Sequence, residues 1–400
     1  MTAYLDQVYL DHAATTPMLP TAIEAYAEAM RVVGNPASIH SQGQNAKRML
    51  EEARETVAAG VGCDPIEIVF TGGGTEAINL AIKGLFWART PRNRILVSGG
   101  EHHATLDTIE WLERHEGALV EWLPLDALGR VDVAAVARAI AANPADVALV
   151  TLLAANNEVG TLQPVAEVAA LAEAHGIPVH VDAVSAYGHV PLDFGALSRA
   201  GVSALSISAH KIGGPVGIGA LVLSRRATVV PLIHGGGQQR QVRSGTQDVA
   251  AAVSFAVAAA AAVADLPGEG ARLAGLRDQV LAGVGAAVPE AVINGDRDPA
   301  GRLPGNAHFT FPGCEGDSLL FLLDVAGVSV STGSACQAGI PEPSHVLRAM
   351  GRSEVEARGA LRITLGRTTT EADVDAFLAA LPAAYAQAAR AGLADREPAR

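Results

Sequence analysis

A lysine and an aspartate end two apolar runs of this sequence, and together they can do chemistry that neither does alone. Lys211 follows the run that starts at Ser206 and leads into Ile-Gly-Gly-Pro, whereas Asp182 ends Ile177-Pro-Val-His-Val-Asp. A lysine desolvated at the end of an apolar strand is suited to forming a Schiff base. Pyridoxal phosphate needs both groups, since a lysine takes its aldehyde and an acid pairs with its ring nitrogen. The pair therefore predicts a pyridoxal phosphate site.

A glycine-rich turn is the candidate for holding the cofactor's phosphate. Phe70-Thr-Gly-Gly-Gly-Thr-Glu-Ala lies between an apolar run and a helical pattern over residues 77–83, so its N–H groups and helix N-terminus can bind an anion. Gly74 and Thr75 are the natural contacts. Taken alone, a glycine-rich turn of this kind is as often a simple turn as a phosphate site. A second donor-rich segment, His234-Gly-Gly-Gly to Thr246, can also reach phosphate, and a contact from so far along the chain often indicates a subunit interface.

Two polar segments follow other apolar runs. Glu101-His102-His103 comes after residues 94–98, and an imidazole there can stack on an aromatic ring and move protons near neutral pH. The alternative is a pair of surface histidines on a loop. Asn156-Asn157-Glu158 follows residues 147–153, and its amides can bind a cofactor hydroxyl or a substrate carboxylate, or can simply build a turn.

Two further residues have the chemistry for a substrate. Cys336 lies in a stretch bounded by glycine and proline, where a thiol can be exposed and nucleophilic if its thiolate is stabilised. Cys63 and Cys314 have the look of buried small hydrophobes. Arg362, near the start of the apolar run 361–365, can grip a carboxylate with its planar guanidinium or form a structural ion pair.

The elements that must position these residues have the pattern of a parallel α/β sheet, because short apolar runs alternate with helical segments from about residue 65 to 225. Ligands bind at the carboxyl ends of such strands, which is where the candidate residues cluster. A smaller C-terminal domain is expected from about residue 262, ending in a helix over about 371–391. The predicted strands are 67–70, 94–98, 118–123, 147–153, 178–182, 204–208 and 219–223, followed by 307–311, 328–332 and 361–365.

Composition limits the function classes. The 400 residues are 49% hydrophobic and carry a net charge of −13, which favours a globular chain and opposes binding to nucleic acid or to an anionic membrane. We expect the Ala-rich stretch 249–264 to be a buried helix, since it is too short for a membrane span. No signal peptide is expected at the start. The three cysteines lack the spacing of a disulfide framework or a zinc site. We therefore expect no metal, and we expect a cytoplasmic location.

Taken together, these motifs resemble the NifS/IscS-like cysteine desulfurases, the class V group within the fold-type I pyridoxal phosphate enzymes. The resemblance runs from Tyr9-Leu-Asp-His-Ala-Ala-Thr-Thr-Pro through Asn35-Pro-Ala-Ser to Arg362-Ile-Thr-Leu-Gly-Arg. It implies a large cofactor-binding domain over residues 15–261 with a mainly parallel seven-stranded sheet. It also implies a smaller α+β domain, formed by residues 1–14 and 262–400, that carries the cysteine.

The resemblance further implies roles for the site residues. Lys211 holds the cofactor covalently, Asp182 pairs with the pyridine nitrogen and His102 stacks over the ring. Thr246 reaches the phosphate of a partner subunit, which implies a homodimer. The other implied contacts are Gly74, Thr75, Asn157, Ser185, Ser208 and His210 for the cofactor, and Arg362 with Asn157 for the substrate carboxylate.

The implied reaction converts L-cysteine to L-alanine. Lys211 removes the Cα proton, Cys336 as thiolate attacks the substrate sulfur and becomes a persulfide, and Lys211 and His102 handle the protons around the departing alanine. The segment around Cys336 matches the NifS/IscS group better than the SufS group. The sulfur acceptor, an iron–sulfur scaffold or a tRNA thiolation enzyme, stays open, because residues 391–400 show no recognisable docking tail.

One departure and three alternatives accompany this interpretation. Ser185 stands where the family usually has a glutamine that bonds the cofactor's phenolic oxygen, which predicts altered cofactor electronics. A class V aminotransferase is opposed by Cys336, which transamination does not need, but a selenocysteine lyase is not. A catalytically idle sulfur-carrier subunit is opposed by the joint presence of Lys211, Asp182, His102, Cys336 and Arg362.

Overall fold

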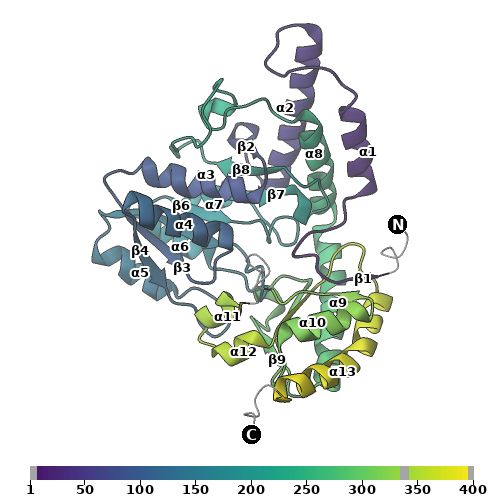
Figure 1. The fold of residues 1–400 in the computed structure, drawn as a ribbon. Coiled ribbons are helices and arrows are strands. Elements are labelled where there is room, and N and C mark those ends of the chain that lie inside the picture. The colour runs from purple at the N-terminus through teal and green to yellow at the C-terminus, as the bar shows by residue number, and fades with distance from the viewer. Residues whose placement is uncertain (1–6, 334–341, 395–400) are drawn as a thin grey trace.

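The computed structural model describes residues 7–333 and 342–394, and the side chains within them up to residue 390. Its centre is a seven-stranded sheet with the order β2-β8-β7-β6-β5-β3-β4 (Figure 1). All neighbours run parallel except β8, which is antiparallel to β2 and to β7. The strands are β2 Ile68–Thr71, β3 Arg94–Ser98, β4 Leu119–Leu123, β5 Val147–Leu153, β6 Val179–Asp182, β7 Val202–Ser208 and β8 Gly219–Leu223.

The seven predicted strands are confirmed, with ends that differ by at most two residues. Every residue of β5 and β6 is buried, because helices cover both faces of the sheet and the strand sequences are correspondingly apolar throughout. Alternate side chains of β2 enter different cores: Ile68 and Phe70 face one, and Val69 faces the other. This arrangement confirms the mainly parallel seven-stranded sheet that the resemblance implies.

Two groups of helices cover the two faces of the sheet. Helices α3 and α4 pack on one face, and α2, α5, α6 and α8 pack on the other. Nine of the sixteen residues of α8 are buried, mostly alanines, and their small side chains let α1 and α2 approach closely. The helices are α1 Pro20–Ala29, α2 Ser41–Val61, α3 Gly74–Trp87, α4 His103–Glu116, α5 Val133–Ala142, α6 Val165–Glu173, α7 Phe194–Arg199 and α8 Val249–Ala264.

A second group of elements has a core of its own, in which Phe309, Phe377 and Leu361 are buried. Its antiparallel sheet has the order β12-β10-β9, and β1 near the N-terminus pairs parallel with β11. Figure 1 shows its helices α9, α10 and α13 together, away from α1 and α2. The elements are β1 Val8–Tyr9, α9 Leu266–Ala287, β9 Val292–Asn294, β10 Asn306–Thr310, α10 Gly316–Val325, β11 Val328–Ser329, α11 His345–Ala349, α12 Glu354–Arg358, β12 Ala360–Thr364 and α13 Glu371–Ala394.

The strand expected over residues 328–332 is confirmed only for its first two residues. It ends at Ser329 and pairs with β1, because Ser331 turns aside to form an isolated bridge with Arg362 of β12. The helix expected over 371–391 is confirmed, and Thr370 caps it by accepting a hydrogen bond from the Asp373 N–H. The domain boundaries near residues 14 and 261 remain a prediction.

In the described part of the chain, no single helix is long and apolar enough to cross a membrane. Helices α8 and α9 reach that length and apolar character only when taken together, and the pair is bent by 73°.

Replacing Phe255 with alanine tests the Ala-rich helix packing. The ring of Phe255 is fully buried and lies edge-on to Phe70 of β2, with centroids 6.4 Å apart. We expect Phe255→Ala to lower the free energy of unfolding by about 3–5 kcal/mol, because alanine leaves a cavity. Denaturant unfolding measures this. Val263→Ala on the same helix, at a side chain 36% exposed, is the control and should change little. Equal losses in both variants would contradict the packing argument.

Candidate active site

A cavity of about 420 Å³ lies at the carboxyl edge of the central sheet, between it and the C-terminal elements. It brings together residues from β6, β7, α3, α4 and β12 that are far apart in the sequence. Most of the candidate residues lie in its wall. The predicted site residues that line it are Gly74, Thr75, His102, Asn157, Asp182, Ser185, Ser208, His210, Lys211 and Arg362.

Lys211 lies on a single 3-10 turn, Ala209–Lys211, that follows β7 directly. Its Nζ donates hydrogen bonds to the carbonyl oxygens of Ala13 and Ala14, the latter at 2.8 Å. Burial, helped by the charge of Arg362, lowers the pKa of Lys211 to about 8, although nearby carboxylates oppose the shift. A lysine with such a pKa has a sizeable neutral fraction near pH 8, which a Schiff-base amine requires.

Asp182 is the last residue of β6 and is 2% exposed. Its Oδ1 accepts a hydrogen bond from the Val184 N–H at 2.9 Å. Burial raises the pKa of Asp182 to about 6, while the Val184 N–H and the charge of Lys211 act in the opposite direction. A carboxyl group in this state gains from a cation placed beside it, and a protonated pyridine nitrogen is such a cation.

His102 is the N-cap residue of α4. Its Nδ1 accepts a hydrogen bond from the Ala104 N–H at 3.0 Å, so in the neutral ring the proton is on Nε2. Burial, with further contributions from Lys211 and the two neighbouring histidines, lowers the pKa of His102 to about 4. The imidazole is therefore neutral at pH 7 and presents a fixed tautomer.

The glycine-rich turn forms the start of α3. A Cβ on Gly74 would lie 2.8 Å from a Val184 methyl group, which would have to move, and φ of Gly73 is 143°, a conformation that favours glycine. Across from it, Ser208 Oγ is buried without a hydrogen-bond partner in the described part of the chain. A tight turn at a helix N-terminus facing a spare hydroxyl suits a phosphate. The residues present thus fit pyridoxal phosphate.

Two side chains that sequence reasoning missed support this turn. Glu76 accepts the Gly72 N–H at 2.7 Å and pairs with Arg243, whose Nε lies 2.9 Å from its Oε1. Gln239 lies in a turn whose three residues all have positive φ, yet its side-chain amide bonds both the N–H and the C=O of Phe70 at 2.8 Å. Gln239 thereby satisfies the open edge of β2. No sequence pattern announces such a pairing.

Arg362 is committed to two partners. Its NH2 group lies 2.8 Å from Asp11 Oδ1, and its NH1 group donates to the Asn157 carbonyl at 2.9 Å. The structural ion pair considered from the sequence is therefore present. Arg362 Nε is nevertheless buried without a partner among the described residues, as is Asn157 Oδ1. The guanidinium is oriented from behind, and one of its donors is spare.

Two predicted site residues are not in this cavity. Thr246 lines a different hollow, which includes Val33, Asn35 and His40. Cys336 lies outside the described residues, between Gly333 and Glu342.

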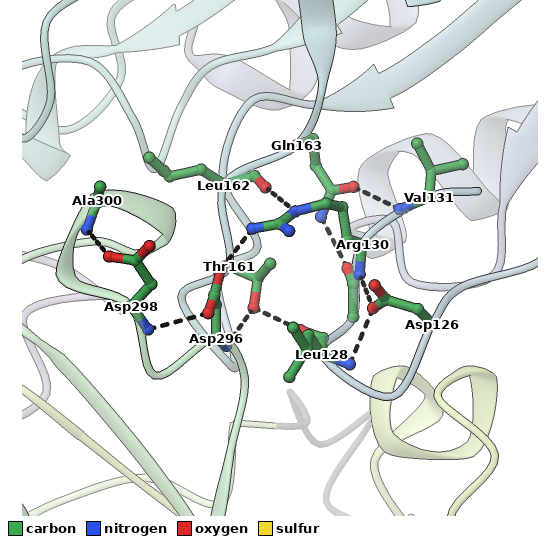
Figure 2. Close-up of polar contacts among 11 residues, drawn as sticks. Asp126, Leu128, Arg130, Val131, Thr161, Leu162, Gln163, Asp296, Asp298 and Ala300 are labelled. Atoms are coloured by element: carbon green, nitrogen blue, oxygen red, sulfur yellow. Dashed lines mark hydrogen bonds and ion pairs between the residues drawn. The ribbon is translucent and has the colours of Figure 1, made fainter. Parts of the chain in front are cut away.

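A polar network holds the segment that carries Asn157 (Figure 2). Thr161 Oγ1 accepts the Asp296 N–H at 3.0 Å and donates to the Leu128 carbonyl at 2.5 Å. Arg130 pairs with Asp296 across the same junction. Three segments, around residues 126–131, 161–163 and 296–300, are joined in this way, so the loop after β5 cannot shift without breaking several bonds.

Comparison with known proteins gives the family. The model of the aminotransferase class-V family matches residues 8–377. The IscS-like cysteine desulfurase of Mycobacterium tuberculosis (strain ATCC 25618 / H37Rv) is 55% identical over 390 residues, which are 96% of this chain and 98% of that protein. The chain therefore belongs to the aminotransferase class-V family and, within it, to the cysteine desulfurases. Members of this family depend on pyridoxal phosphate.

Solved structures agree with this assignment. A NifS-like protein superposes with a TM-score of 0.87 at 35% identity, covering 95% of this chain and all of that one. A structure described as SspA in complex with cysteine superposes with a TM-score of 0.75 at 34% identity, covering 89% of this chain and 98% of that one.

Replacing Asp182 with asparagine tests its burial through the pH dependence of stability. The raised pKa means that the folded apoprotein favours the neutral acid, so the stability from this group is full below about pH 4 and is lost as the pH rises through about 6. Asparagine cannot ionise. We expect the free energy of unfolding of the Asp182→Asn apoprotein to exceed that of the wild-type apoprotein by about 3 kcal/mol at pH 8 and to match it near pH 4. Denaturant unfolding across this range checks it, and parallel pH profiles would contradict it.

Proposed function

We propose that this cysteine desulfurase converts L-cysteine to L-alanine and retains the sulfur on Cys336 as a persulfide. The observation that carries the proposal is the cavity in which Lys211, Asp182 and His102 converge. The structurally similar SspA was solved with cysteine, which supports cysteine as the substrate class.

The same cavity supports pyridoxal phosphate as the cofactor. Lys211 would hold its aldehyde, Asp182 its ring nitrogen, and His102 its ring face. Gly74, Thr75 and Ser208 would hold its phosphate, together with His210 and with Thr246 of a second copy. When bound, the cofactor supplies an electron-withdrawing ring that makes the substrate Cα proton acidic.

Proton transfer falls to Lys211 and His102. Burial favours the neutral form of the Lys211 amine, so Nζ can take the Cα proton once it is released from the cofactor. Ala13 and Ala14 then orient that nitrogen through their carbonyl oxygens. His102 contributes a hydrogen bond from Nε2, because its Nδ1 is occupied by the helix cap.

The substrate carboxylate would bind Arg362 and Asn157. The spare Nε of Arg362 is a donor for it, and Asp11 fixes the guanidinium so that little side-chain entropy is lost on binding. Asn157 contributes its side-chain amide from the loop after β5, which the hydrogen bonds of Thr161 in Figure 2 hold four residues further on.

The sulfur-transfer step balances without an outside reductant. The Cys336 thiolate attacks the substrate sulfur, the S–S bond forms as the C–S bond breaks, and the substrate carbon gains protons to leave as alanine. The persulfide then passes to an acceptor, which we propose to be an iron–sulfur scaffold or a tRNA thiolation enzyme.

The quaternary structure and location belong to the same proposal. Thr246 lies outside the cavity of its own chain, which supports a homodimer in which each copy completes the other's phosphate site. Free cysteine as substrate is consistent with a cytoplasmic enzyme. No binding of nucleic acid, membrane or metal forms part of the proposal.

Removing the Cys336 thiol tests the sulfur-transfer step. We expect Cys336→Ala to bind as much cofactor as the wild type but to lose persulfide and sulfide formation from L-cysteine with a reductant. Cys63→Ala is the control, because burial raises the pKa of Cys63 to about 12 and makes it a poor nucleophile. Undiminished sulfide release by Cys336→Ala would overturn the mechanism.

Changing Ser185 to glutamine tests the departure from the family pattern. Ser185 lines both the main cavity and a small neighbouring one that also includes Asn157, so a longer side chain has room to extend. In Ser185→Gln we expect the longer side-chain amide to donate a hydrogen bond directly to the cofactor's phenolic oxygen. This bond should lower the pH midpoint of the cofactor's visible absorbance change. Spectrophotometric titration of both proteins measures this, and superimposable curves would count against it.

A further inference from the structure

The carbonyl oxygens that hold the Lys211 amine belong to a short turn near the N-terminus, residues 11–16. Lys211 Nζ donates hydrogen bonds to the carbonyls of Ala13 and Ala14. In the described part of the chain these are the only hydrogen-bond partners of that nitrogen. The place of the free amine in the cavity therefore depends on the place of this turn.

His12 joins the two ends of the turn. Its side chain is 5% exposed, and its Nδ1 lies 2.5 Å from Thr16 Oγ1. This hydrogen bond connects the residue before Ala13 to the second residue after Ala14. Burial lowers the pKa of His12 to about 4, so the ring is neutral at pH 7 and has one donor and one acceptor nitrogen.

The second ring nitrogen of His12 attaches the turn to the C-terminal elements. Nε2 lies 3.3 Å from Thr369 Oγ1. Thr369 is itself held, because its Oγ1 accepts the Gly366 N–H at 2.9 Å and its C=O accepts from Arg272 at 2.7 Å. The imidazole thus spans from the turn to a firmly bonded part of the chain.

The turn also contacts the residue directly before Lys211. The Thr16 N–H donates to the His210 carbonyl at 3.1 Å, and Thr15 Oγ1 lies 3.1 Å from His210 Nδ1. A displacement of Thr16, the hydrogen-bond partner of His12, would therefore act on the backbone beside Lys211 as well as on the carbonyls that hold its amine.

Close packing does not hold this turn. Two small cavities of about 40 Å³ each adjoin it, one lined by His12, Thr16 and Lys211 and the other by His12, Ala13 and Lys211. Atoms that line a cavity lose the dispersion contacts that normally resist displacement. The position of the turn therefore depends on its hydrogen bonds more than on packing.

We infer that His12 is a positioning residue for proton transfer, because its two hydrogen bonds fix the turn whose carbonyl oxygens hold the released Lys211 amine. With the acceptors fixed, Nζ occupies one place when it takes the substrate Cα proton. Small misplacements of a reacting group are costly in rate. This inference rests on the proposed role of Lys211.

A first test uses the apoprotein, in which Lys211 is free. Labelling lysine Cε with ¹³C gives one NMR signal for each of the three lysines, which are Lys47, Lys83 and Lys211. In His12→Ala we expect the titration midpoint of the Lys211 signal to fall by at least about one pH unit, because the acceptors that stabilise its charged form are no longer fixed. The other two signals are internal controls and should keep their midpoints. The charged groups that influence Lys211 and that this variant retains are Arg362, Asp11 and Asp182.

A second test uses the holoenzyme and the exchange of the L-alanine Cα hydrogen with D₂O, followed by NMR. Lys211 Nζ takes the proton from Cα, exchanges it with solvent and returns a deuteron, so Cys336 has no part in this reaction. In His12→Ala we expect normal cofactor content and exchange at saturating alanine that is at least about tenfold slower. The KM for alanine should change little, since Arg362 and Asn157 are retained.

Matched variants distinguish positioning from the loss of a buried side chain. His12→Asn keeps a hydrogen-bonding atom near the place of Nδ1, so it should recover most of the exchange rate. Thr16→Val removes only the partner hydroxyl and should slow exchange as His12→Ala does, and the two changes combined should add little. Thr108→Val is the control, because it removes a buried hydroxyl that bonds the Ala104 carbonyl within α4, and it should exchange as the wild type does.

The outcomes also separate this inference from the proposed function. If the Lys211 midpoint in His12→Ala and Thr16→Val is unchanged or raised, or if these variants raise the KM without slowing exchange at saturation, His12 does not position Lys211. If the wild-type holoenzyme exchanges no Cα hydrogen although the midpoint falls in both variants, the proposed function fails, and with it the role of His12 in proton transfer.

Discussion

The site depends on a lysine that the fold buries without giving it a direct carboxylate partner. Lys211 Nζ is bonded to two backbone carbonyls, and Asp11 and Asp182 influence its pKa from further away. Burial of a charged amine is unfavourable, and the neutral form is the one that reacts with an aldehyde. The unfavourable burial of Lys211 therefore also makes its amine reactive, because it increases the neutral fraction. The same burial raises the pKa of Asp182, so one cavity gives the lysine and the aspartate the properties that the proposed cofactor requires.

The order of strands explains why these groups meet. β5, β6 and β7 are neighbours and run parallel, so their carboxyl ends, followed by Asn157, by Asp182 at the end itself, and by Lys211, lie at one edge. Helices α3 and α4 begin at that edge too and bring their N-terminal N–H groups to it. The topology of the parallel sheet is therefore enough to bring a carboxylate, an amine and two helix N-termini to the same edge.

The other wall of the cavity comes from the ends of the chain. The N-terminal segment supplies Asp11 and the carbonyl oxygens that hold Lys211, and β12 supplies Arg362. Because β1 pairs with β11, and Asp11 bridges to Thr364, these two distant parts of the sequence are one structural unit. Glu158, in the loop after β5, connects the central sheet to the C-terminal elements through hydrogen bonds with Ser344 and Asn306.

The sequence alone determined the central sheet and the identity of most cavity residues. Apolar runs report burial on both faces, and the polar residue at the end of each run marks the ligand edge, so Asp182, Lys211 and His102 were identifiable without coordinates. It made the strand over 328–332 too long, because a short apolar run does not reveal that the chain leaves β1 after Ser329 and bridges to β12 at Ser331. Nothing in the sequence indicated that Gln239 bonds the backbone of Phe70 or that Glu158 bonds Ser344. Their contacts join residues distant in sequence through single side chains, and only the tertiary structure decides such pairings, since periodicity records which residues are buried and not what they touch.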